Sequence, residues 1–251
     1  MDELLVEKLL CFAMALTRIS AFFLFVPVFG WEIIPMTIKV AATVLLSVFF
    51  YLTNPPAVAV EHLSALQVTL LLGSEATYGL ALGAIANILF SAVKLGGRIA
   101  EHQMGLSMAQ VLDPLSKERG QPVGSLLEMM FVIAFLSANG HHLLIKVIQR
   151  SYELFPSGKI PTVSVLAGNM LEATSTMLVA GLRLAAPILA AMLILLVALA
   201  ILARIVPEMN IFFISFPLRI LLGFVMLIVF VPFIDGFVGE MAQLMAKILP
   251  L

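Results

Sequence analysis

The chain has few charged residues and only one cysteine. Asp, Glu, Lys and Arg make up 12% of its 251 residues, whereas soluble globular domains carry about 25%. A water-soluble fold of this size would have too few charges to cover its surface. The single cysteine, Cys11, cannot form an internal disulfide, which excludes a secreted disulfide scaffold. The net charge of −1 lacks the basic excess that nucleic-acid binding requires.

What the chain has instead is apolar sequence, at 62% of its residues, which excludes intrinsic disorder. A bilayer core of about 30 Å needs roughly 20 helical residues, and the long apolar runs lack the alternation of membrane β-strands. The sequence therefore predicts an all-α integral membrane protein. The fifth apolar stretch, about twice the length of one span, is expected to bend or to break near Pro187. The six stretches are 9–31, 33–52, 63–90, 123–145, 163–203 and 211–234.

The chain gives no clear sign of its orientation in a membrane. Its first residues are acidic rather than basic, so we expect the first helix to be retained rather than cleaved as a signal peptide. Lys and Arg divide almost evenly between the two sides of a six-span topology, where an ordinary inner-membrane protein shows a bias. A simple bundle surrounded by lipid is therefore not favoured.

Several charges lie within or at the edges of the apolar stretches, and each costs at least about 2.5–3.5 kcal/mol at the bilayer centre. We expect Arg18 and Glu75 to be buried against another polypeptide. Lys39 and Arg183 lie near helix ends, where they either reach the interface or pack on partner helices. Isolated Glu75 and Glu128 leave open a second function, a proton-coupled secondary transporter. The charges are Arg18, Lys39, Glu75, Glu128, Glu172, Arg183 and Arg219.

Glycines and two polar loops mark the expected contacts and connections. Gly79 and Gly83 have the spacing that lets two helix backbones approach closely, and Gly96-Gly97 is expected to end that helix. The loop 94–122 carries an uncharged centre, so we expect it to be buried or to close something; the alternative is an amphipathic connector at the membrane interface. The loop 146–162 is broken by proline and glycine.

Catalytic signatures are absent from the sequence. It contains no HExxH, GxSxG, Walker A or GxGxxG motif. His141 and His142 are adjacent, so they point about 100° apart on a helix and do not form a metal-binding pair on one face. The sequence predicts no catalytic residues, no metal site and no cofactor.

Four groups of residues occur together in the order of one known family. They are Gln103–Ser107 followed by Asp113-Pro114; Asn139-Gly140-His141 followed by Ser151, Pro156 and Gly158; Arg204–Asn210 running into Phe216-Pro217-Leu218; and Pro27–Gly30 after Arg18. Over essentially its whole length the chain thereby resembles the FliR family of flagellar and virulence type III export proteins. It departs from the family at Glu208, commonly glutamine; at Ser215, commonly glycine; and at Met108 and Val111, where phenylalanines are frequent.

The resemblance implies a fold of interlocking, broken helical hairpins, in which residues 1–180 are FliP-like and 181–251 form a FliQ-like hairpin. It implies a structural export-gate subunit, not an enzyme, in the bacterial inner (cytoplasmic) membrane at the flagellar basal body. Its implied partners are FliP and FliQ, with FlhB and FlhA, and unfolded protein substrates in transit. The equivalent subunit of a virulence injectisome is the alternative use.

The loop 105–122 resembles the family's channel plug, and the resemblance implies that it closes the channel at rest. A plug there is physically reasonable, because apolar side chains at a constriction exclude water and methionine adapts to varied surfaces. The predicted plug and gate residues are Met104, Gly105, Leu106, Ser107, Met108, Val111, Asp113 and Pro114. The candidates for packing between subunits are Arg18, Glu75, Gly79, Gly83, Arg204, Pro207, Asn210, Phe216 and Pro217.

Overall fold

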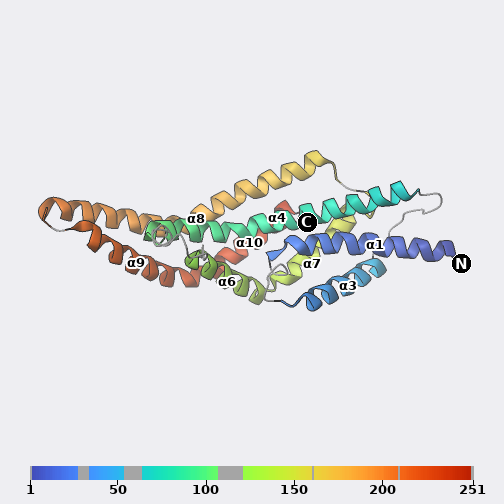
Figure 1. Ribbon diagram of the computed structural model, residues 1–251, viewed down its shortest axis with the longest axis horizontal. Coiled ribbons are helices and arrows are strands. Elements are labelled where there is room, and N and C mark those ends of the chain that lie inside the picture. The colour runs from blue at the N-terminus through green and yellow to red at the C-terminus, as the bar shows by residue number, and fades with distance from the viewer. Residues whose placement is uncertain are drawn as a thin grey trace, which may run out of the picture. The chain divides into compact units, whose positions relative to one another are not determined.

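The computed structural model describes residues 2–27, 34–53, 64–106, 121–159, 161–208 and 210–249. Within these ranges every regular element is helical, so the predicted all-α fold is confirmed (Figure 1). The elements are α1 (Asp2–Phe25), α3 (Met36–Thr53), α4 (Ala65–Met104), α6 (Pro122–Ser137), α7 (Gly140–Leu154), α8 (Val163–Ile205), α9 (Ile211–Phe230), the 3₁₀ turn η1 (Val231–Phe233) and α10 (Ile234–Ile248).

Among these helices, five continuous segments are long and apolar enough to cross a membrane, and α6 with α7 could form a sixth. The fourth apolar stretch is broken at Asn139, which has a left-handed φ of 60°. Asparagine is one of the few residues that tolerate this conformation.

The longest helix, α8, continues through Pro187 for 43 residues, so the expected alternative of two separate elements is wrong. Proline removes one backbone hydrogen bond, and helices in membranes tolerate this loss where neighbouring groups compensate. The helix is therefore one element from Val163 to Ile205.

The glycine pair in α4 does not end that helix, contrary to expectation, because α4 runs on to Met104. Both glycines serve close packing instead. A Cβ at Gly97 would lie 2.5 Å from Gly124 Cα, and one at Gly96 would lie 2.5 Å from Leu184 Cδ2. The first third of the expected polar loop 94–122 is consequently helical.

The chain folds into two compact units with interleaved sequence. The first comprises Met1–Leu89, Asn139–Ser175 and Met241–Leu251, and the second comprises Phe90–Ala138 and Thr176–Glu240. The helices α4, α8 and α10 each contribute to both units. The predicted division at residue 180 separates a FliP-like from a FliQ-like part of the sequence. It does not concern which residues pack into one compact unit, and it stays a prediction.

Each unit has its own apolar core. In the first, α1 supplies fully buried Met14, Ile19 and Phe22, and α3 stacks Phe50 on Tyr152 of α7 with ring centroids 5.6 Å apart. The core of the second unit is aromatic. Its rings pack edge to face or stacked within 6.2 Å of one another, and they belong to Phe90, Phe131, Phe135 and Phe237.

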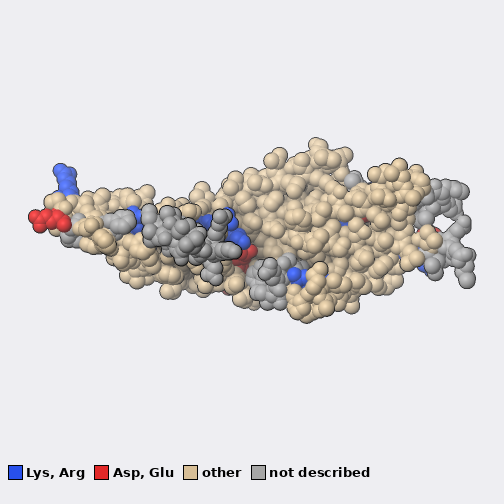
Figure 2. All heavy atoms as spheres, in the orientation of Figure 1, with Lys and Arg blue, Asp and Glu red and all other residues tan. Residues whose placement is uncertain are grey.

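Large apolar side chains also cover the outside of several helices. Leu45 on α3, Ile194 on α8 and Ile228 on α9 are about 70% exposed, and Figure 2 shows a face on which charged groups are few. Exposed apolar surface on this scale marks contact with lipid or with other polypeptides.

Candidate functional site

The N-terminal base of the predicted plug is anchored on α9. Met104, in the last turn of α4, is fully buried, and its side chain fills the space that a Cβ at Gly223 would occupy, with Sδ at 2.6 Å from that position. Gly105 has φ +79°, and Phe216 lies 3.5 Å from its Cβ position. A positive φ at Gly105 favours glycine over any other residue. We call Met104, Gly105, Phe216 and Gly223 the Met104 notch.

The C-terminal base of the predicted plug is anchored on α4. Arg98 Nε donates to Gln121 Oε1 at 2.5 Å, and the backbone N–H of Gly124 donates to the carboxylate of Glu101. Gly97 and Gly124 complete the contact by letting α4 and α6 approach closely. These five residues form what we call the α4–α6 clamp.

Glu101 is a functional candidate that the sequence did not reveal. It is 4% exposed, and its Oε2 atom has no hydrogen-bond partner among the described residues. The sequence predicted a loop from Lys94 onward, so Arg98 and Glu101 were not considered as helical neighbours. In α4, which extends to Met104, these two residues are three positions apart and lie one turn from each other on the helix.

The central plug residues fall outside the part of the chain that the structure describes. Leu106 is half-buried at the end of that part. The others predicted for the seal or its shape are Ser107, Met108, Val111, Asp113 and Pro114, which lie outside the described residues.

A buried ion pair joins α1 and α4 in the first unit. Arg18 Nε lies 2.5 Å from Glu75 Oε2, and the two side chains are 1% and 0% exposed. This corrects the expectation that another polypeptide buries them, because the chain pairs them with each other. The helix contact predicted at Gly79 and Gly83 explains how: a Cβ at either glycine would collide with the α1 backbone, at the carbonyl of Arg18 or Phe22.

The pair also holds the end of α7 and the turn that follows it. Glu75 Oε1 accepts the backbone N–H of Gly158 at 2.7 Å. Arg18 Nη1 donates to the carbonyls of Phe155 at 3.0 Å and Ser151 at 3.3 Å. These carbonyls lie at the C-terminus of α7, where a cation is electrostatically favourable.

Two tyrosines enclose the guanidinium of Arg18. Its central carbon lies 4.9 Å from the ring centroid of Tyr78 and 4.2 Å from that of Tyr152, within the range of cation–π attraction. Arg18 Nη2 and the Tyr78 hydroxyl find no partner among the residues described. We call this assembly the Arg18 cluster; its members are Arg18, Glu75, Tyr78, Ser151, Tyr152, Phe155 and Gly158.

The remaining packing candidates lie around the connection between α8 and α9 and are all exposed; they are Arg204, Pro207, Asn210, Phe216 and Pro217. Asn210 precedes α9, and its backbone carbonyl accepts the N–H of Phe213 at 3.2 Å. The role of these residues in packing between subunits stays a prediction.

The described residues do not gather into a metal site. Nowhere in the described ranges do three His, Cys, Asp or Glu side chains come together. The ring centroids of His141 and His142 lie 4.2 Å apart, and the two ring planes are tilted by 37°.

Comparison with known proteins shows a match over nearly the whole chain. Residues 9–245 match the family described as bacterial export proteins, family 1. The chain is 32% identical over 223 residues to flagellar biosynthetic protein FliR of Bacillus subtilis (strain 168), covering 87% of this chain and 85% of that protein.

Two further relatives span the flagellar and virulence branches. The flagellar biosynthetic protein FliR of Escherichia coli (strain K12) is 29% identical over 238 residues, a match that covers 93% of this chain and 90% of the relative. The Yop proteins translocation protein T of Yersinia pestis is 28% identical over 233 residues, covering 91% and 88%.

Proposed function

The chain belongs to family 1 of the bacterial export proteins, and from that membership we propose its particular role. It is a membrane component of a type III protein export apparatus of the FliR kind. We assign it to the export gate of the flagellar basal body, as a structural subunit in the bacterial inner membrane. The flagellar assignment takes its support from the names of two of these relatives, and the injectisome alternative from the third.

In this role the chain assembles with FliP and FliQ into an entry portal for unfolded proteins, next to FlhB and FlhA. The observation that carries the proposal is the family match over residues 9–245. The exposed apolar faces of α3, α8 and α9 support it, because a subunit surrounded by other helices needs apolar surface beyond its own core.

The segment 105–122 helps to plug the closed channel. Support comes from its two bases: the Met104 notch holds one end, and the α4–α6 clamp holds the other. Both described ends of the segment are thus anchored within the second unit, which suits a seal that has to close again after a substrate has passed. Its uncharged centre suits a constriction that closes by excluding water.

The contacts of the two candidate relay carboxylates favour a structural role over a transporter. One carboxylate oxygen of Glu75 accepts a hydrogen bond from Arg18, and the other accepts the backbone N–H of Gly158. Glu128 Oε2 lies 3.3 Å from Lys94 Nζ. A proton relay needs a carboxylate that exchanges protons along a pathway, whereas Glu75 is buried and both of its oxygens are held by fixed partners.

The plug is tested by replacing residues 106–112 with a Gly/Ser linker of equal length and measuring ion leakage across the membrane. We expect leakage to rise while FliP and FliQ still co-purify with the variant. The matched control replaces Gly236 by Ala, where the structure leaves open space. Unchanged leakage in an assembled variant would refute the plug without touching the export-gate assignment.

A further inference from the structure

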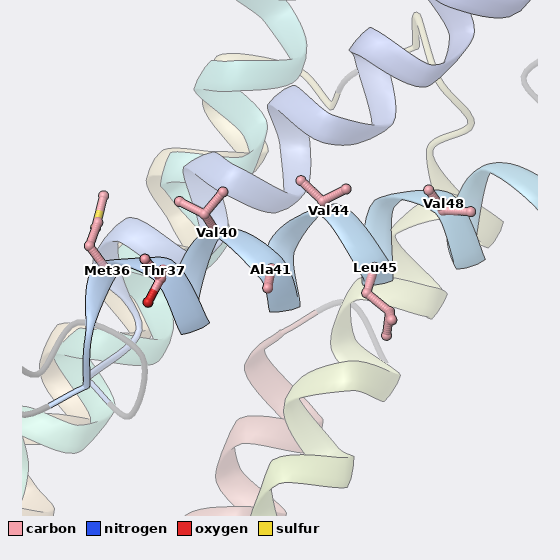
Figure 3. Close-up of a pocket in the computed structure, with 7 residues that line it drawn as sticks. All are labelled: Met36, Thr37, Val40, Ala41, Val44, Leu45 and Val48. Carbon is pink, nitrogen blue, oxygen red and sulfur yellow. The ribbon is translucent and has the colours of Figure 1, made fainter.

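A groove between α1 and α3 in the first unit belongs to none of the sites described above. It encloses about 440 Å³. One wall is formed by Leu16, Phe23 and Leu24 of α1, and the other by Lys39, Val40 and Val44 of α3. A second hollow, lined by α3 alone, shares Met36, Val40 and Val44 with the groove. In Figure 3, Val40 and Val44 point to the side on which α1 lies.

The groove carries its charge at one end. Lys39 is half-buried, and no carboxylate of the described residues lies within 4.0 Å of its ammonium group. It occupies the first turn of α3, where its backbone N–H bonds to the carbonyl of Pro35 at 3.3 Å. The positive end of the helix dipole adds to the lysine charge there.

Most of the other lining side chains are apolar, and the two hydroxyls, of Ser20 and Thr43, donate to backbone carbonyls of their own helices. Three of the apolar side chains are open to an occupant. Leu24, Val40 and Val44 are 70%, 51% and 41% exposed. The groove therefore presents an apolar channel with a cation at the helix terminus, and α3 is a candidate membrane span. This arrangement complements an amphiphile whose anionic head lies at the membrane interface and whose tail runs into the bilayer.

The volume of the groove favours a lipid tail over a helix. A helix with its side chains is about 10–12 Å across and rises about 5.4 Å per turn, so a single turn fills roughly 400–600 Å³. The groove beside the contact of α1 with α3 holds about 440 Å³, room for about one turn of a helix, whereas a flexible acyl chain can lie along it.

We propose that this groove binds one acyl chain of an anionic phospholipid, with the headgroup phosphate on Lys39. The charge of Lys39 makes the groove prefer a lipid with an anionic headgroup. The valine and leucine side chains along the groove hold the acyl chain. The same contact explains how Lys39, which has no carboxylate partner among the described residues, is kept in an apolar span, because the phosphate supplies its counter-charge.

The test is native mass spectrometry of the full chain, purified in mild detergent with whatever export-gate partners it retains. Phosphatidylglycerol and phosphatidylcholine with identical acyl chains are added in turn. We expect one phosphatidylglycerol to remain bound per chain. The variant Lys39→Gln should lower its retention by about fivefold, the effect of one lysine at an anionic surface, and Lys39→Arg should preserve it.

A second variant tests the groove itself. Val44→Trp fills the space between α1 and α3, so it should reduce retention of both lipids. Its control is Ile38→Trp, on the same helix, 57% exposed and outside the groove lining. The control for the charge is Lys247→Gln, a lysine 74% exposed elsewhere in the same unit.

Either of two results would overturn the proposal. One is equal retention of phosphatidylglycerol by the wild-type chain and Lys39→Gln, with both folded as judged by thermal unfolding. The other is unchanged retention by Val44→Trp. Because neither measurement depends on export, failure here leaves the proposed function standing.

Discussion

The guanidinium of Arg18 and the carboxylate of Glu75 form an ion pair 2.5 Å long that is almost completely removed from solvent. The residues are 57 positions apart, on α1 and α4, and their further hydrogen bonds reach the end of α7 and its following turn. The Arg18 cluster thus fixes three helices of the first unit relative to one another. Removing one partner of such a pair leaves an uncompensated buried charge.

Replacing Glu75 by Gln should therefore destabilise the chain by about 3–5 kcal/mol. The guanidinium would lose its counter-charge while remaining buried. Thermal unfolding of the purified chain in detergent measures the effect. The control is Glu172→Gln, whose carboxylate is 51% exposed and 3.8 Å from Lys247, and which should cost at most about 1 kcal/mol.

The double variant Arg18→Met with Glu75→Leu sharpens this test. Replacing both charges by apolar groups of similar volume is often neutral or stabilising, so most of the stability lost in Glu75→Gln should return. A Glu75→Gln variant that is as stable as wild type but has lost all activity would instead point to a proton relay.

The close crossing of α4 and α6 makes a separate prediction. A Cβ at Gly97 would lie 2.5 Å from Gly124 Cα, so Gly97→Ala must push two backbones apart, at a cost of about 1–3 kcal/mol. Gly73→Ala, on the same helix but with nothing within 4 Å, should be neutral or stabilise by up to about 1 kcal/mol because alanine favours helix. Equal unfolding temperatures for the two variants would contradict the crossing.

The Met104 notch makes a prediction about the seal. In Gly223→Ala the new methyl group would collide with Cγ, Sδ and Cε of Met104, so the whole methionine side chain must leave its place. We expect stability to fall by about 1–3 kcal/mol, with increased ion leakage through the assembled gate.

A compensating change provides the check on that interpretation. Adding Met104→Ala to Gly223→Ala leaves room for the new methyl group and should bring leakage back toward the wild-type level. Leakage that is unaffected by Gly223→Ala, in a gate that assembles normally, would show that the notch does not position the plug.

The sequence was sufficient to predict the features that depend on composition and local spacing. Apolar length predicted membrane helices, and the small residues Gly79 and Gly83 predicted a close helix contact, which the structure has between α4 and α1. These signals are readable because they depend on neighbours within one or two helical turns.

Features that depend on which helices meet were out of reach. The charges Arg18 and Glu75 each looked unpaired, because their pairing follows from the packing of α1 on α4. Gly96-Gly97 carried the composition of a helix end, yet neighbouring backbones use those glycines for close approach. In both cases tertiary contacts outweighed local preference.

The most direct test of the whole account is the composition of the complex that this chain forms in a membrane. The chain is co-expressed with FliP and FliQ from the same bacterium, purified through a tag on this chain alone, and weighed by native mass spectrometry. The account predicts a hetero-oligomer that retains both partners. A stable monomer or homo-oligomer that retains neither, under conditions where both partners are expressed, would contradict it.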